Sequence, residues 1–182
     1  MKKSLVISGS GGQGVMSAGV MIAQTAVEAN KYATYLPEYG PEQRGGSAKC
    51  TVVVDDDEII SPLAKMCDMF IALNEQAYKK FSGQLKAGGV LVVNSNRVIS
   101  EITREDITVV KVPADDISVE VGNVRAANIV MLGALIGASD SFITEEAMLD
   151  SLKKKFAKLK PEIQQQNIDA LKKGIELGKA VK

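Results

Sequence analysis

The chain has 182 residues and a mass of 19.4 kDa, the size of one domain around one hydrophobic core. It contains no histidine and only two cysteines. This composition excludes histidine-dependent hydrolase triads and histidine metal sites, and it leaves too few thiolates for an iron-sulfur cluster. The 22 basic and 22 acidic residues cancel to a net charge of +0, which argues against a nucleic-acid partner.

No apolar run reaches the length of a membrane span, and no signal peptide is evident, so we expect a cytoplasmic protein with no membrane contact. The charges are unevenly distributed. Residues 151–182 hold nine lysines and three acids, an excess of +6 that leaves −6 on the first 150 residues. This excess is typical of a solvated helical face, and a docking surface is the alternative.

The first predicted element is an apolar strand at residues 4–8, followed by a glycine turn at 9–14 and a helix at 15–29. Residues 32–36 form the next predicted strand. Residues 37–46 contain two prolines and three glycines among charged residues, which indicates a long structured loop and a candidate site.

The middle of the chain alternates short apolar runs with polar segments. A helix is expected at residues 75–86, and Gly88-Gly89 is expected to open the strand that follows it. This alternation predicts one α/β domain over residues 1–182, Rossmann-like, with a mainly parallel sheet flanked by helices and a helical C-terminal end. The strands predicted here are residues 48–54, 69–73, 90–93 and 107–112.

The helical end begins with residues 126–138, which are apolar nearly all round. Such a helix is buried within the fold or against a partner, so we expect a homodimer when the chain is studied alone. Thr144 is expected to cap the next helix and Pro161 to start the last one. One apolar stripe is predicted between them, formed by Leu149, Leu152, Phe156 and Leu159.

Gly9, Gly11 and Gly14 fit the dinucleotide fingerprint G-x-G-x-x-G, after a strand and before a helix. Glycine permits a positive φ and lets a phosphate approach the backbone, and the following helix offers free N–H groups to an anion. A tight turn without a ligand is the alternative. In the same turn, Gln13 could place an amide in the anion site.

A nicotinamide site also needs an acid at the end of the second strand, which holds the ribose. Glu38 is the nearest candidate, but it follows Pro37 inside the glycine-rich loop. An independent NAD- or FAD-binding oxidoreductase is therefore an alternative reading, although no Tyr-x-x-x-Lys pair is present. A non-enzymatic nucleotide-binding scaffold is a second alternative.

The loop at residues 38–46 brings Arg44 together with Glu38 and Glu42. We expect it beside the glycine turn, because the first two strands are commonly neighbours in such folds. With GSGGQG at residues 9–14 and YGPEQRGG at 39–46, the chain resembles the gamma subunit of 2-oxoacid:ferredoxin oxidoreductases. The segment GNVRAAN at residues 122–128 is similar to a third signature of that family.

The resemblance implies a non-autonomous subunit of an enzyme that decarboxylates a 2-oxoacid and forms an acyl-coenzyme A. Thiamine diphosphate, magnesium and iron-sulfur clusters would lie on partner subunits, with coenzyme A as a shared substrate and ferredoxin as the electron acceptor. The implied partners are alpha, beta and ferredoxin-like delta subunits, and this chain would help to seat coenzyme A. A gamma chain without attached ferredoxin-like sequence favours 2-oxoglutarate as the substrate.

No catalytic residue and no metal ligand is predicted. Arg44 would contact a phosphate or, equally, pair with Glu38 or Glu42 to shape the loop. Asn123 and Asn128 would bind a ligand or cap a helix. The predicted cofactor-binding residues are Gly9, Gly11, Gly12, Gln13, Gly14, Arg44, Gly45, Gly46, Asn123 and Asn128.

Overall fold

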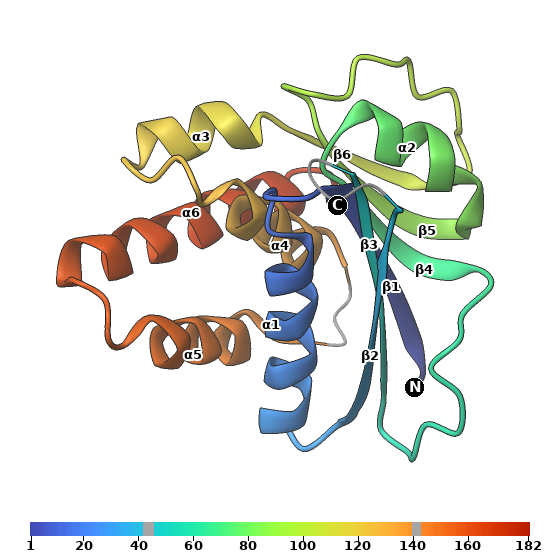
Figure 1. Ribbon diagram of the computed structural model, residues 1–182, viewed down its shortest axis with the longest axis horizontal. Coiled ribbons are helices and arrows are strands. Elements are labelled where there is room, and N and C mark those ends of the chain that lie inside the picture. Colours follow the sequence, from blue (N-terminus) through green and yellow to red (C-terminus); the bar gives the residue numbers. More distant parts are fainter. Residues whose placement is uncertain (42–45, 140–142) are drawn as a thin grey trace.

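A six-stranded sheet in the order β2-β3-β1-β4-β5-β6 organises the chain (Figure 1). The computed structural model describes residues 1–41, 46–139 and 143–182. Strands β1, β4, β5 and β6 are parallel, whereas β3 is antiparallel to both of its neighbours. The strands are β1 (Lys3–Ser10), β2 (Tyr32–Tyr39), β3 (Ser47–Asp55), β4 (Cys67–Ala72), β5 (Leu85–Asn94) and β6 (Thr108–Val112).

The predicted α/β fold with a mainly parallel sheet is confirmed, but the expected pairing of the first two strands is wrong. β3 lies between β1 and β2 and pairs with both of them. The pattern of burial explains this order. Residues Val52, Val53 and Val54 are buried on both faces of β3, as an inner strand requires, whereas β2 is half exposed and forms the sheet edge.

The helices cover the two faces of the sheet unequally (Figure 1). One face carries α1 and α4, with α5 and α6 packed against them, and the other face carries the short α2. The helices are α1 (Val15–Glu28), α2 (Glu75–Phe81), α3 (Ala114–Glu120), α4 (Ala127–Ala138), α5 (Glu145–Phe156) and α6 (Pro161–Lys179). None of the helices in the described ranges is both long and apolar enough to cross a membrane.

Helix α4 is buried inside the domain. The sheet lies on one side of it and α6 packs closely on the other. Gly133 on α4 and Gly174 on α6 permit this approach, because a Cβ atom on either would overlap the backbone of the opposite helix. The apolar surface of α4 is therefore used within the chain and does not supply the surface of the expected homodimer, which stays a prediction.

Several predicted boundaries need correction. β2 extends to Tyr39 and so takes up the start of the predicted loop at 37–46. The helix expected at 75–86 ends at Phe81, and a 3-10 turn (Ser82–Gln84) leads into β5, so that Gly88-Gly89 lies inside that strand. Helix α3 was not predicted.

The predicted start signals of the last two helices are confirmed. The hydroxyl of Thr144 accepts a hydrogen bond from the Ala147 amide at 3.1 Å, which caps α5, and Pro161 opens α6. The predicted apolar stripe is partly wrong. Leu159 lies beyond the end of α5, and Met148 and Leu152 are the residues that this helix buries in the core.

Candidate functional site

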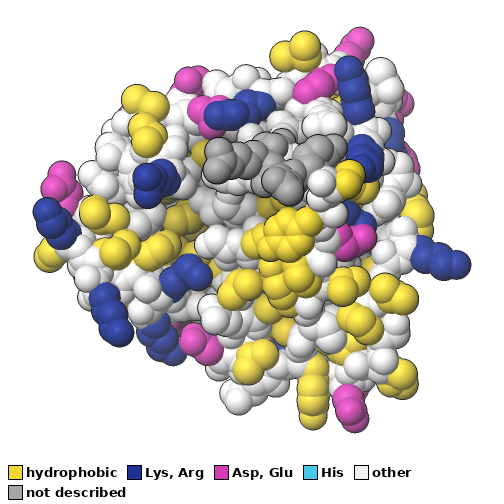
Figure 2. Space-filling model, in the orientation of Figure 1, with side chains coloured by type: hydrophobic (Ala, Val, Ile, Leu, Met, Phe, Trp, Pro, Cys, Tyr) yellow, Lys and Arg dark blue, Asp and Glu magenta, His cyan; other side chains and the backbone are white. Residues whose placement is uncertain are grey.

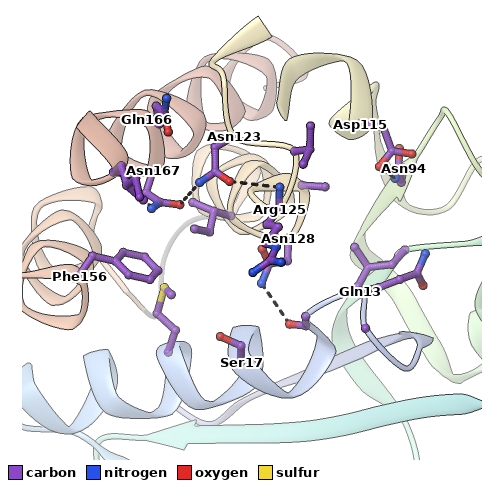
Figure 3. A pocket seen from close by; sticks show the side chains of 18 of the residues that line it. Gln13, Ser17, Asn94, Asp115, Asn123, Arg125, Asn128, Phe156, Gln166 and Asn167 are labelled. Carbon is purple, nitrogen blue, oxygen red and sulfur yellow. Dashed lines mark hydrogen bonds between the residues drawn. The ribbon is translucent and has the colours of Figure 1, made fainter. Parts of the chain in front are cut away.

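A pocket of about 1000 Å³ lies where α1 and α4 begin, between these helices and the α5–α6 pair (Figure 3). Strand β1 leads into it through the glycine turn, and the loop after α3 leads into it from the other side. The predicted residues Gly12, Gln13, Gly14, Asn123 and Asn128 all line this one pocket. Sequence motifs more than 100 positions apart therefore meet in one place.

The glycine turn needs glycine at two positions. Gly12 has a φ of 90° and Gly14 a φ of 78°, both in the left-handed region that disfavours a side chain. The side-chain oxygen of Gln13 accepts hydrogen bonds from the Ser10 amide at 2.7 Å and from Asn74 at 2.9 Å. That oxygen fixes the turn. The side-chain nitrogen of Gln13 has no hydrogen-bond partner in the described parts of the chain.

The glycine turn is stabilised by close packing at Gly9 and by a hydrogen bond between Gly11 and Gly46. A Cβ at Gly9 would lie 2.6 Å from the Gln13 side-chain oxygen, so glycine is needed there for packing. The Gly11 amide donates a hydrogen bond to the Gly46 carbonyl at 3.0 Å. Gly46, the last residue of the predicted second loop, therefore lies beside the glycine turn, and β3, which begins at Ser47 and pairs with β1, places it there. The predicted residues Arg44 and Gly45 lie outside the described residues.

Asn128 links the beginnings of two helices. It is 7% exposed, and its side-chain nitrogen donates a hydrogen bond to the Gly14 carbonyl at 3.2 Å (Figure 3). Gly14 precedes α1, and Ala126 precedes α4. Neither residue offers a side chain to cap the helix, whereas Asn74 caps α2. The uncapped amides at the start of α1 and α4 favour an anion in the pocket.

Asn123 has a structural role in the described contacts. Its side-chain nitrogen donates to the Asn167 side-chain oxygen at 3.1 Å, and its own side-chain oxygen accepts from the Arg125 amide at 3.2 Å (Figure 3). These bonds tie the loop before α4 to α6. They do not make Asn123 the helix cap that was the alternative to ligand binding, because Ala126 occupies the position before α4.

Sequence reasoning missed the polar residues that follow β5. Asn94 ends this buried strand, and its side-chain oxygen accepts from the Ala114 amide at 3.3 Å. Arg97 pairs with Asp115 at 2.6 Å, and both line the pocket. A signal was available, because polar residues directly after a buried strand of a parallel sheet lie at the edge where ligands bind.

The other end of the pocket is apolar. The Phe156 ring points into it (Figure 3), and Met21, Leu159 and Ile163 also line the pocket. Residues 153–160 contain five lysines, all of them exposed. Figure 2 shows Lys and Arg side chains outnumbering acidic ones over the α5–α6 side, on the left of the view. The pocket therefore has an apolar end within a positive surface.

The two cysteines lie elsewhere and are unreactive. Cys50 and Cys67 are fully buried. Burial raises the pKa of the Cys50 thiol to about 12 and that of Cys67 to about 11. Neither is a candidate nucleophile.

The comparisons with known proteins agree with this architecture. The model of the family Pyruvate ferredoxin/flavodoxin oxidoreductase matches residues 4–177. The 2-oxoglutarate synthase subunit KorC of Methanocaldococcus jannaschii is 38% identical over 187 residues, which cover 98% of this chain and 95% of KorC. The ketoisovalerate oxidoreductase subunit VorA of Methanothermobacter marburgensis is 34% identical over 83% of this chain, but the match covers only 31% of that longer relative.

Solved structures give the same result. The gamma subunit of a keto/oxoacid ferredoxin oxidoreductase from Geobacter sulfurreducens has a TM-score of 0.85 and 30% identity, with coverage of 100% of this chain and 98% of that one. The 2-oxoglutarate:ferredoxin oxidoreductase of Magnetococcus marinus, solved with 2-oxoglutarate, coenzyme A and succinyl-CoA bound, has a TM-score of 0.89 and 26% identity; the match covers 100% of this chain and 32% of that chain. The chain therefore belongs to the pyruvate ferredoxin/flavodoxin oxidoreductase family, and over its full length it is of the gamma-subunit type.

Proposed function

We propose that this chain is the gamma subunit of a multi-subunit 2-oxoacid:ferredoxin oxidoreductase, in which it seats coenzyme A. Alpha and beta subunits would hold thiamine diphosphate and magnesium, and a ferredoxin-like delta subunit would hold iron-sulfur clusters. Thiamine diphosphate on those partners supplies the decarboxylation chemistry. This chain contributes a binding pocket and surfaces for assembly.

The observation that carries the proposal is the meeting of two uncapped helix starts in one pocket. The diphosphate of coenzyme A would accept hydrogen bonds from the amides of the Gly12–Gly14 turn and from those at the start of α4. Asn128 holds the two helix starts together through its bond to the Gly14 carbonyl. A volume of about 1000 Å³ suits a ligand of nucleotide size.

The sheet topology argues against an independent NAD-dependent enzyme. The acid expected to hold a ribose, Glu38, lies on β2, which β3 separates from β1. Glu38 is instead paired with Lys49 at 2.9 Å. The likeness to a gamma subunit along the whole chain also favours a non-autonomous role. The reconstitution experiment described below also tests whether the chain is a non-enzymatic scaffold.

For the substrate we propose 2-oxoglutarate. Support comes from KorC, a 2-oxoglutarate synthase subunit, which matches this chain over 95% of its own length, whereas the ketoisovalerate relative is matched over 31%. The Magnetococcus marinus structure was solved with 2-oxoglutarate bound. Selection of the 2-oxoacid would reside mainly on the partner subunits.

Reconstitution tests this proposal. The chain and the candidate alpha, beta and delta subunits are purified and assayed separately and together for coenzyme A-dependent reduction of ferredoxin. We expect activity only with all subunits present, and fastest with 2-oxoglutarate among 2-oxoglutarate, pyruvate and 2-oxoisovalerate. Full activity without this chain, or turnover by this chain alone, would contradict the proposal, and faster turnover of another 2-oxoacid would contradict the substrate assignment.

A further inference from the structure

The pocket has two arginines in different electrostatic states. Arg97 is neutralised by Asp115 at 2.6 Å. Arg125 is exposed, and within the described parts of the chain it forms no ion pair. Removal of Arg97 would therefore free a carboxylate, whereas removal of Arg125 would take one uncompensated positive charge from the pocket.

The backbone of Arg125 is held in place. Its amide donates to the Asn123 side-chain oxygen at 3.2 Å, and Asn123 is in turn bonded to Asn167 on α6 at 3.1 Å. The next residue, Ala126, precedes the first turn of α4. The backbone that carries the Arg125 guanidinium is therefore fixed beside the uncapped start of α4.

The charges of coenzyme A distinguish two kinds of phosphate. Its diphosphate can be bound by backbone amides, and each of the two helix starts offers about half a positive charge. Its 3′-phosphate is a monoester with an additional charge of about −1.5 to −2. A guanidinium binds such a group with two parallel hydrogen bonds.

We propose that Arg125 binds the 3′-phosphate of coenzyme A and makes the pocket prefer coenzyme A over 3′-dephospho-coenzyme A. This inference rests on the proposed function, because it requires coenzyme A in the pocket. Both molecules carry the same diphosphate and the same thiol. Their discrimination therefore depends on one group, and among the described residues that line the pocket Arg125 is the cation without an ion-pair partner.

The test measures KM for both thiols in the assembled enzyme, with wild-type chain and with Arg125→Ala, Arg125→Lys and Arg104→Ala. Wild type should use coenzyme A with a KM about tenfold or more below that of the dephospho form. Arg125→Ala should remove most of this preference by raising the KM for coenzyme A alone, and Arg125→Lys should restore part of it. Arg104→Ala, which removes an arginine outside the pocket, controls for general loss of surface charge.

Three results would overturn the inference: a wild-type enzyme that does not discriminate, an Arg125→Ala variant that raises both KM values equally, and an equal loss of preference in Arg104→Ala. Gly12→Val separates this failure from failure of the proposed function. If coenzyme A binds here, Gly12→Val raises both KM values whatever Arg125 does. If Gly12→Val and Arg125→Ala both leave both values unchanged, coenzyme A does not bind in this pocket and both proposals fall.

Discussion

Two glycines in the pocket adopt backbone conformations that disfavour any other residue. Gly12 and Gly14 both have positive φ, but their surroundings differ. A Cβ at Gly12 would meet no atom within 4 Å, whereas a Cβ at Gly14 would overlap the Asn128 side chain. From the sequence, glycine in this turn was expected to permit a positive φ. The sequence could not show that Gly14 is also required by a residue 114 positions away.

The buried thiols give a pH-dependent stability. In the unfolded chain a thiol ionises near pH 9, whereas burial raises the pKa of Cys50 to about 12 and of Cys67 to about 11 in the folded state. Above pH 9 the folded state therefore binds more protons than the unfolded state, and the free energy of unfolding falls as pH rises. The stability that each buried thiol contributes is complete below pH 9 and is lost as the pH rises toward the pKa of that thiol in the folded state.

We expect a loss of about 1 kcal/mol per pH unit for each thiol between pH 9 and 10.5. Urea unfolding at several pH values measures this slope, and Cys50→Ala should reduce it by about half. An equal slope in wild type and Cys50→Ala would show that the burial of this thiol does not control alkaline stability.

At the scale of elements, the contact of α4 with α6 depends on backbone approach. A Cβ at Gly174 would overlap the Val130 carbonyl oxygen, and one at Gly178 would overlap that of Ala134. These atoms belong to helix backbone and cannot move independently of the helix. Separation of α4 from α6 would also shift Asn167 away from Asn123, since these residues join α6 to the loop at the pocket.

We therefore predict that Gly174→Ala lowers the free energy of unfolding by about 3 kcal/mol or more. Helix propensity alone would favour alanine by about 1 kcal/mol, so the sign of the change decides between the two effects. Gly83→Ala is the control, because its Cβ would have no neighbour within 4 Å. It should change the stability by no more than about 0.5 kcal/mol. A more stable Gly174→Ala chain would mean that the two helices are not in such close contact.

The positions of strands and helices along the chain were more predictable than their arrangement in space. The apolar runs located all six strands, and Thr144 and Pro161 marked the starts of α5 and α6. Helix α3 was missed although α2, of the same seven-residue length, was predicted. The order of β3 and β1 was missed because strand neighbours depend on burial of both faces of β3, which local pattern does not report.

At the scale of the whole molecule, the candidate site combines segments from the entire chain. The glycine turn and the GNVRAAN segment were identified from sequence, and the fold brings them to one pocket. Phe156 reaches the pocket through helix packing, which no local motif encodes, whereas Asn94 and Arg97 carried a signal in the sequence as polar residues at the end of a buried strand. The positive surface over α5 and α6 corresponds to the lysine excess in residues 151–182.

The central claim is that coenzyme A binds at the glycine turn, and one comparison in the assembled enzyme tests it most directly. Gly12→Val places a branched side chain at a φ of 90° in the pocket, and Gly88→Val places the same side chain at a φ of 74° outside it. Both carry a similar backbone strain of about 1–3 kcal/mol, so their difference reports the pocket alone.

We measure KM for coenzyme A and, separately, the rate of thiamine-dependent decarboxylation for each variant in complexes of verified composition. The account predicts that Gly12→Val raises the KM for coenzyme A about tenfold or more while decarboxylation stays within about twofold of wild type, and that Gly88→Val changes neither. An unchanged KM for coenzyme A in a well-assembled Gly12→Val enzyme would contradict it and would make the glycine turn a structural feature only.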